Sequence, residues 1–389
     1  MNLRKDIWKL DKIENVCQVI SGGTPSRNVL EYFGGYNAWF TPTEIPKNKI
    51  EEVILSEENI TELGLKKSSA KVLPKGTVLF TSRATIGMIA IAGKEITTNQ
   101  GFANFICNDK ILYNWYLAYW LNSKVALIKS LSSGTTFKEI SKTTIRSLLI
   151  HLPPIEEQKK IASLFQAIET AMEQVEGQEK NLYKFKHKLL KDLFSEKQEL
   201  GNHLQAKDFE TVRFDKIAKN ISERVEPKKT ELTTYVGLDH LDADNLNIER
   251  TGTPDDVIGT KLKIYKGDII FGKRRAYLRK VAVSHFDGIA SAHSMILRAD
   301  EKNIEKDFLP YFMQSETFMT RAVQISEGSL SPTIKNSTLA KQEFILPKKD
   351  KQKELISIFK QFDATMGLLK QQKTTLKNLK QKLLNEILG

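Results

Sequence analysis

The stretch LPPIEEQKKIASLF, residues 152–165, begins a helix: prolines precede the first turn, acids lie within it, and apolar residues follow at helical spacing. A related stretch, LPKKDKQKELISIF, occupies residues 346–359. Shifting the chain by 194 positions lays residues 152–194 over residues 346–388 without a gap, with 13 identities in 43 positions. The same long helix is therefore expected to occur twice.

The repeat extends upstream of both helices. SSGTTFKEISKTTIRSLLIHLP (132–153) and SEGSLSPTIKNSTLAKQEFILP (326–347) keep the same offset, and KGTVLFTSRATIGMIAIA (75–92) resembles KGDIIFGKRRAYLRKVAV (266–283) at a shift of 191. KLDKI at residue 9 and RFDKI at residue 213 lie near the two starts. Two units of about 190 residues, each a globular part followed by a helix, predict a pseudo-twofold molecule.

Both helices carry apolar residues every seven positions over five heptads, which predicts a coiled coil. Each is expected to run for roughly 40 residues, or about 60 Å, longer than one domain face requires. An antiparallel pair would bury both stripes, whereas two helices packed on separate cores are the alternative. We assign helix pairing and partner docking to Gln158, Ile161, Phe165, Ile168, Val175, Gln178, Leu182, Leu189, Gln352, Leu355, Phe359, Phe362, Leu369, Gln372, Leu376 and Leu383.

Two glutamines are expected to fix the register of this helix pair. Gln178 and Gln372 occupy equivalent seam positions near the middle of each helix. Single polar residues at core positions specify register in coiled coils. A polar layer formed by these two side chains is therefore our hypothesis.

The globular parts mix strands and helices. Short apolar runs such as TVLF (77–80), IAIA (89–92) and DIIF (268–271) indicate strands, whereas residues 114–131 and 307–325 have helical patterns. We predict an α+β (mixed α/β) fold with globular domains at residues 1–151 and 198–345. Spacer helices at residues 152–197 and 346–389 complete the chain.

The charge balance favours a polyanionic partner. The 389 residues carry a net charge of +12, with a pI near 9.3, and nucleic acid is the commonest polyanion. Cys17 and Cys107 are the only cysteines, so no disulfide framework is expected. The start lacks the pattern of a signal peptide, and no run of eighteen apolar residues occurs. These features predict a cytoplasmic protein.

Signatures of catalysis are missing from the sequence. SGGTP (21–25) has no phosphate-loop lysine, the six histidines form no HExxH pattern, and LPPI lacks the preceding Asn or Asp of amino-methyltransferases. We therefore expect no catalytic residue and no metal site. An enzyme with an unfamiliar site and a basic coiled-coil scaffold that reads no bases are the alternatives.

Polar and basic loops offer DNA-binding chemistry instead. FGKRRAYLRK (271–280) can neutralise phosphates and place an arginine fork on a guanine, and the amides of TTNQGF (97–102) suit adenine. A solvated hairpin and a self-bonded turn are the alternatives for these loops. The candidate DNA-binding residues are Thr24, Arg27, Ser82, Arg83, Thr85, Asn99, Gln100, Thr135, Lys273, Arg274, Arg275, Tyr277, Arg279, Ser291, His293, Ser329 and Ser331.

These motifs, in this order, resemble the specificity subunit of type I restriction-modification systems. SGGTPSR (21–27), TSRATIG (81–87), TNQGF (98–102) and GTTFKEIS (134–141) are similar to its first target recognition domain. YVGLDHL (235–241), FGKRRAYLRKVAV (271–283) and GSLSPTI (328–334) are similar to the second, and LPPIEEQKKIA to the start of its spacer helix. The second helix departs from this pattern, since LPKKDKQKEL lacks the double proline and the Glu before Gln352.

The resemblance implies a non-catalytic reader of double-stranded DNA. Each recognition domain would read one half of a bipartite target, and the helices would set the spacing between the halves. Two modification subunits, which bind S-adenosylmethionine and methylate adenine, would dock on the helices. Restriction subunits that use ATP and Mg could join them, and this chain itself would hold no cofactor.

Overall fold

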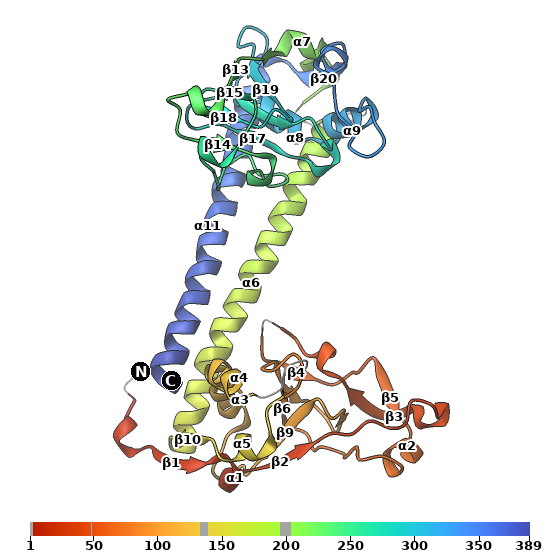
Figure 1. The fold of residues 1–389 in the computed structure, drawn as a ribbon, viewed down its shortest axis with the longest axis vertical. Helices are drawn as coiled ribbons and strands as arrows, with labels where there is room; N and C mark the ends of the chain where they lie inside the picture. The colour runs from red at the N-terminus through yellow and green to blue at the C-terminus, as the bar shows by residue number, and fades with distance from the viewer. Residues whose placement is uncertain (1–2, 48, 133–138, 195–203) are drawn as a thin grey trace. The chain divides into compact units, whose positions relative to one another are not determined.

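The computed structural model describes residues 3–47, 49–132, 139–194 and 204–389. Contacts divide the chain into unit 1, Met1–Glu176 with Gln371–Gly389, and unit 2, Gly177–Lys370 (Figure 1). The long helices α6 (Ile155–Leu193) and α11 (Lys349–Leu388) contribute to both units. Both begin a few residues later than predicted, because Leu152 and Leu346 lie in strands instead.

Unit 1 contains a five-stranded sheet of order β2-β9-β6-β7-β4, a three-stranded sheet of order β5-β3-β8, and the pair β1-β10. Its strands are β1 (Lys9–Lys12), β2 (Cys17–Ser21), β3 (Phe33–Phe40), β4 (Glu52–Val53), β5 (Glu58–Ile60), β6 (Val78–Thr81), β7 (Ile89–Ala92), β8 (Thr97–Thr98), β9 (Phe102–Cys107) and β10 (Leu149–Leu152). Its short helices are α1 (Ile13–Val16), α2 (Glu62–Lys66), α3 (Asn114–Ser123), α4 (Val125–Ser130) and α5 (Lys142–Arg146).

Unit 2 repeats this plan, because the order β12-β19-β16-β17 of one sheet corresponds to β2-β9-β6-β7, and the pair β11-β20 corresponds to β1-β10. Its second sheet has the order β13-β15-β18-β14. The strands are β11 (Phe209–Arg213), β12 (Ala218–Ile221), β13 (Arg224–Val225), β14 (Tyr235–Val236), β15 (Lys261–Ile264), β16 (Ile269–Gly272), β17 (Val281–Val283), β18 (Gly288–Ala290), β19 (Ser294–Ala299) and β20 (Glu343–Pro347). The short helices are α7 (Phe214–Ile217), α8 (Leu309–Gln314), α9 (Glu316–Gln324) and α10 (Asn336–Leu339). The predicted α+β duplication is confirmed.

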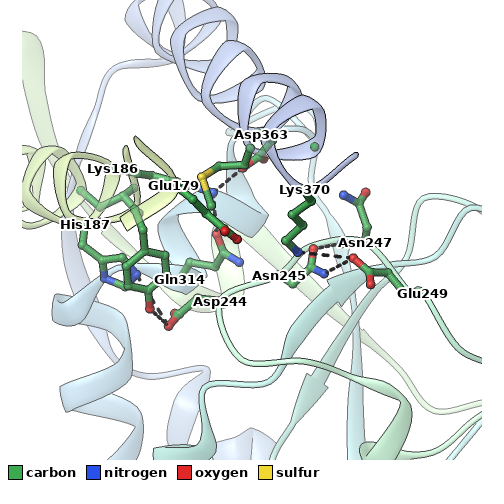
Figure 2. Close-up of a pocket in the computed structure, with 14 residues that line it drawn as sticks. Glu179, Lys186, His187, Asp244, Asn245, Asn247, Glu249, Gln314, Asp363 and Lys370 are labelled. Carbon is green, nitrogen blue, oxygen red and sulfur yellow. Dashed lines mark hydrogen bonds and ion pairs between the residues drawn. The ribbon is translucent and has the colours of Figure 1, made fainter. Parts of the chain in front are cut away.

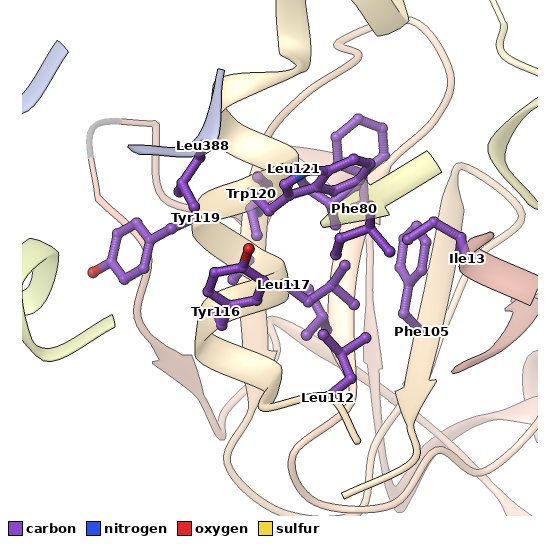
Figure 3. Packing of buried hydrophobic residues seen from close by; sticks show 14 of the residues in the cluster. Ile13, Phe80, Phe105, Leu112, Tyr116, Leu117, Tyr119, Trp120, Leu121 and Leu388 are labelled. Carbon is purple, nitrogen blue, oxygen red and sulfur yellow. The ribbon is translucent and has the colours of Figure 1, made fainter. Parts of the chain in front are cut away.

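The middle strands of unit 1 are buried on both faces, which explains why VLFT and IAIA are continuous apolar runs. Phe80 and Phe105 belong to the core on the face that α3 covers. Leu79, on the opposite face of the sheet, belongs to a second core together with Phe40 of β3. Figure 3 shows the side chains of α3 against Phe80, with Leu388 of α11 beside the same helix.

The two long helices pair in antiparallel orientation within each unit. In unit 1 the late residues Leu384 and Leu388 of α11 share a core with the early residue Ile161 of α6. In unit 2 the late residue Leu193 of α6 shares a core with the early residue Phe359 of α11. The predicted antiparallel pair is confirmed, and its ends are also part of the two globular cores.

Burial along the predicted seam is uneven. Among the assigned seam residues, Ile161, Phe165, Ile168, Val175, Leu355, Phe359 and Leu369 are buried, whereas Leu182, Leu189, Phe362, Leu376 and Leu383 are half-buried. Buried residues occur near the middle of the helices, as Val175 and Leu369 do, and half-buried ones occur near the domains, as Leu189 and Leu383 do. Seam position alone therefore does not determine burial.

The predicted glutamine layer is wrong. Gln178 and Gln372 are both exposed. Polar layers occur elsewhere, and each joins both helices to a tyrosine of the neighbouring globular domain. A carboxylate lies at the centre of each layer; Glu169 in unit 1 is buried and Asp363 in unit 2 is half-buried.

In unit 1, Glu169 of α6 accepts a hydrogen bond from the Tyr119 hydroxyl at 2.7 Å and is paired with Lys380 of α11 at 2.5 Å. In unit 2, Asp363 of α11 accepts from the Tyr311 hydroxyl at 2.7 Å and is paired with Lys186 of α6 at 2.5 Å. Burial, and then the adjacent carboxylate, raise the pKa of both tyrosines, which keeps their hydroxyls protonated as donors.

These two triads are related by the sequence repeat, because Glu169 and Asp363 are 194 residues apart, as are Lys186 and Lys380. A charged pair of this kind is satisfied in one register only, whereas apolar seam contacts discriminate registers less sharply. The triads therefore perform the role that we predicted for the glutamines.

The assigned docking residues Gln158 and Gln352 are not on a docking surface, since both are buried. The Gln158 amide oxygen accepts from the backbone N–H of Tyr113 at 2.8 Å, and its amide nitrogen donates to the carbonyls of Ile111 and Pro153 at 2.9 Å. Gln352 repeats this arrangement in unit 2 with Glu305 and Pro347. Each glutamine therefore fastens the start of a long helix to its own globular domain.

Gln158→Ala is expected to destabilise the chain by about 1–3 kcal/mol, because it removes the buried amide that accepts from the N–H of the half-buried Tyr113. Gln178→Ala, an exposed glutamine on the same helix, is expected to change stability by less than about 0.5 kcal/mol. Urea unfolding followed by circular dichroism measures both. Equal effects would contradict the anchoring role.

Candidate nucleic-acid interface

The same pattern of backbone hydrogen bonds supports a candidate DNA-binding loop in each unit. After β6 in unit 1, the N–H of Ile140 donates to the carbonyl of Ser82 at 3.0 Å. After β16 in unit 2, the N–H of Ile334 donates to the carbonyl of Lys273 at 3.0 Å. Each bond fastens the loop after the strand to the polar loop that precedes a short helix, α5 or α10.

The residue directly after Ser82 or Lys273 also forms a β-bridge with the polar loop. Arg83 forms an antiparallel bridge with Glu139, and Arg274 forms one with Thr333. The next residues, Ala84 and Arg275, have φ of 59° and 57°. Non-glycine residues adopt this left-handed conformation at a cost on the order of 1 kcal/mol or more, and such residues cluster at functional sites.

In unit 2, three loops bring basic and polar side chains together. Arg274 contacts Nε2 of His293 at 3.2 Å and donates to the Ser331 hydroxyl at 3.1 Å, and Arg275 donates to the same hydroxyl at 3.3 Å. Partial burial, followed by Arg274, Lys273 and Lys261, lowers the pKa of His293. A neutral His293 can accept a hydrogen bond from Arg274. Among the described residues, the side-chain partners of this guanidinium are His293 and Ser331, neither of which is a carboxylate.

Three more predicted residues of unit 2 differ in their surroundings. Ser329 is exposed on a loop closed by two hydrogen bonds between Glu327 and Thr333, of 3.1 and 2.9 Å. Lys273 is half-buried, with a pKa lowered by that burial and then by Arg224. Tyr277 is exposed but lines a separate pocket with Arg279 and Glu316. The cluster therefore combines positive charge and hydrogen-bond donors.

Unit 1 offers a more neutral set of side chains. Thr24 hydrogen-bonds to the amide oxygen of Gln100. The Asn99 side chain accepts from the N–H of Gly101 at 2.8 Å, which is the self-bonded turn that we considered as the alternative. Arg83 and Thr85 are exposed. Thr135 lies outside the described residues.

Four predicted contact residues serve the fold instead. Arg27 forms hydrogen bonds with both carboxylate oxygens of Glu58, at 2.8 and 2.6 Å, and lies over the rings of Phe33 and Trp39. Ser82 and Ser291 are buried. The fourth residue is Arg279, which an internal network holds in place.

Arg279 donates to Asp244 at 2.8 Å, to Glu316 at 3.0 Å and to the carbonyl of Gln314 at 2.6 Å. Its three nitrogens are therefore all used inside unit 2. Sequence reasoning missed Asp244 because it lies 35 residues from Arg279 and belongs to no motif. The prediction that Arg279 contacts DNA is not supported.

A polar pocket of about 300 Å³ adjoins this network, between the helices of unit 2 and its globular domain (Figure 2). The polar side chains around it pair with one another. Lys186 forms an ion pair with Asp363, Tyr183 donates to Asp244 at 2.9 Å, and Asn245 donates to Glu249 at 2.9 Å. This pattern is that of an internal joint between helix and domain. The residues that line this pocket include none of the predicted DNA-binding residues. They do include Asp244, the carboxylate that holds Arg279.

Within residues 3–47, 49–132, 139–194 and 204–389, His, Cys, Asp and Glu form no group of three or more that could hold a metal ion. In that same part of the chain, no helix is both long and apolar enough to cross a membrane.

Comparison with known proteins identifies the family. The model of the type I restriction modification DNA specificity domain matches residues 5–183 and again residues 206–378. The MjaIX specificity subunit of Methanocaldococcus jannaschii is 35% identical over 224 residues, which cover 57% of this chain and 50% of that protein. The MjaVIII specificity subunit of the same organism is 24% identical over 98% of this chain and 92% of that protein.

A solved structure shares the fold. The crystal structure of the type I restriction-modification S subunit from M. genitalium covers 99% of this chain and 97% of that one, with a TM-score of 0.59 and 16% identity. The duplicated family match explains the internal repeat, since each copy contains one candidate DNA-binding loop and one long helix. The chain belongs to the family of DNA specificity subunits of type I restriction-modification enzymes, whose members recognise DNA and are not catalytic.

Proposed function

We propose that each unit reads one half of a bipartite double-stranded DNA target through its recognition loops. The convergence of Arg274, Arg275, His293 and Ser331 from three loops carries this proposal. Charged donors that are not neutralised by carboxylates suit phosphates and guanine edges, and the net charge of +12 favours the same partner. Chromosomal DNA as the target would place the chain in the cytoplasm.

Sequencing of methylated adenines in cells with and without the gene tests this function. We expect a bipartite motif to lose its methylation when the gene is deleted and to regain it when the gene is restored. An unchanged methylation pattern in a strain that expresses the remaining subunits would overturn the proposal. In that experiment the deleted strain provides the control for other methyltransferases.

The long helices are proposed to dock two copies of one modification subunit. Phe185 and Phe362 pack together in unit 2 with ring centroids 5.6 Å apart, although 59% of Phe185 is exposed. At the repeat offset of 194, unit 1 has Leu379, 42% exposed, and the buried Ile168. Two exposed apolar residues related by the repeat, Phe185 and Leu379, suit two copies of the same partner.

These partner subunits would supply the chemistry. In this proposal the modification subunits bind S-adenosylmethionine and methylate adenine, and restriction subunits that use ATP and Mg join the complex. The chain described here contributes target choice and assembly. No cofactor is assigned to it.

The helices are also proposed to set the gap between the two half-sites. Inserting one heptad into both α6 and α11 adds about 10.5 Å of helix, or roughly three base pairs at ~3.4 Å per pair. We expect the preferred gap to grow by that amount in selections from DNA libraries with variable gaps. Conservative substitution of one exposed heptad, without insertion, is the control. An unchanged gap in a complex that still assembles would contradict the ruler.

A further inference from the structure

One pair of arginines occupies the same structural position in both recognition domains. Arg83 and Arg274 are 191 residues apart, which is the offset of the surrounding repeat. Each arginine directly follows a residue, Ser82 or Lys273, whose carbonyl accepts a hydrogen bond from the polar loop. Each arginine also forms an antiparallel β-bridge with that loop. Residue types around them differ between the units, so the shared feature is the arginine on a common pattern of backbone hydrogen bonds.

The backbone after each arginine is held in the same unfavourable conformation. Ala84 and Arg275 both have left-handed φ although neither is glycine. A turn that only had to reverse the chain could use glycine here at no steric cost. Because the strain recurs in both units with different side chains, it is tied to the placement of the preceding arginine rather than to Ala84 or Arg275 themselves.

The contacts of Arg274 leave a usable hydrogen-bonding fork. One terminal nitrogen contacts His293 and the other donates to Ser331, so each keeps a second hydrogen, and Nε–H is a further donor. Both partners are uncharged acceptors. The guanidinium is therefore oriented in advance while its positive charge is retained, as specific readout requires.

Arg83 is positioned through its Nε, whereas Arg274 is positioned through its terminal nitrogens. The Nε of Arg83 lies 3.7 Å from Glu139, and both side chains are about half exposed. Its terminal nitrogens have no partner among the residues that the structure describes around this loop. A fork is again available, although the nearby carboxylate reduces its attraction for phosphate.

We infer that Arg83 and Arg274 are the equivalent base-reading residues of the two units, and that each specifies a guanine at the corresponding position of its half-site. A guanine presents O6 and N7 to a planar fork, which is the commonest specific arginine contact in the major groove. Arg275 has no basic counterpart in unit 1, where the residue is Ala84. Arg275 is accordingly assigned to a phosphate.

This inference rests on the proposed function, and one experiment separates the two. The full chain, assembled with its modification subunits, selects duplexes from a library randomised in both halves. Wild type is expected to select one guanine in each half that depends on these arginines. Arg274→Ala should reduce the preference for guanine over other bases about 5- to 150-fold in one half and leave the other half unchanged. Arg83→Ala should do the reverse.

Three variants control for charge and folding. Arg274→Lys keeps the charge but loses the fork, so it should lose selectivity like the alanine variant. Arg275→Ala should weaken binding to all sequences alike and reduce the salt slope by about one. Arg213→Ala removes an exposed arginine paired with Asp215 and should leave both halves selective.

The outcomes are distinct. A selective wild type whose guanine preferences survive both alanine substitutions would overturn the assignment and leave the proposed function intact. A uniform loss of affinity in Arg274→Ala, with selectivity preserved, would make Arg274 a phosphate contact and overturn it as well. A wild-type complex without base preference in either half would overturn the proposed function and the assignment together.

Discussion

Glu169→Lys is expected to destabilise the chain by about 3–5 kcal/mol, because it places two like charges in a buried site and removes the acceptor of Tyr119. Adding Lys380→Glu to the same chain should recover most of this loss, since the pair is then restored with its charges exchanged. Urea unfolding of the three variants, followed by circular dichroism, gives the coupling energy directly.

Two further substitutions make the test specific. Glu156→Lys reverses a charge on the same helix at a site where Glu156 is 72% exposed and paired with Lys159, and it should cost no more than about 1 kcal/mol. Asp363→Lys with Lys186→Asp repeats the exchange in unit 2. A double variant no more stable than Glu169→Lys alone would refute the view that complementary charge defines this contact.

The seam positions show how far heptad patterns predict the helix pair. The period of seven identified the apolar stripes by which the helices pair, because apolar residues dominate those contacts. The pattern did not identify Glu169 as buried, since it directly follows the seam residue Ile168 at a place that is exposed in an isolated two-helix coil. Tyr119, which belongs to a different element, covers it.

Gln178 illustrates the opposite error. Its identity with Gln372 in the repeat and its seam position suggested a buried layer. In the structure Gln178 is exposed although the nearby seam residue Val175 is buried, and Gln372 is exposed although Leu369 is buried. Sequence identity between repeats therefore indicated a shared environment correctly but did not reveal that this environment was solvent.

The recognition loops show a similar limit. Sequence motifs selected loops whose side chains converge in unit 2, because basic and small polar residues between strands are typical of nucleic-acid contacts. They could not separate Arg274 from Arg279, which lie five positions apart in one basic run. That separation depends on Asp244 and Glu316, whose carboxylates hold Arg279, and on neutral Ser331, which positions Arg274.

Phe185→Asp is expected to leave the chain able to hold one modification subunit instead of two, and Leu379→Asp is expected to do the same through the other patch. A carboxylate at the centre of an apolar contact should weaken docking at least about 30-fold, since central apolar anchors contribute about 2 kcal/mol or more. The double variant should hold none. Native mass spectrometry of the purified complexes counts the subunits directly.

Controls for this experiment use apolar residues that are more exposed but lie away from the helices. Ile258→Asp in unit 2 and Leu55→Asp in unit 1, at 86% and 79% exposure, should leave two modification subunits bound. Folding is monitored by the unfolding transition of each variant, which should match that of its control. Because the patches are related by the repeat, the two single variants should behave alike. A single variant that loses both subunits at once, while still folded, would show that the partners assemble as a pair and not on two separate patches.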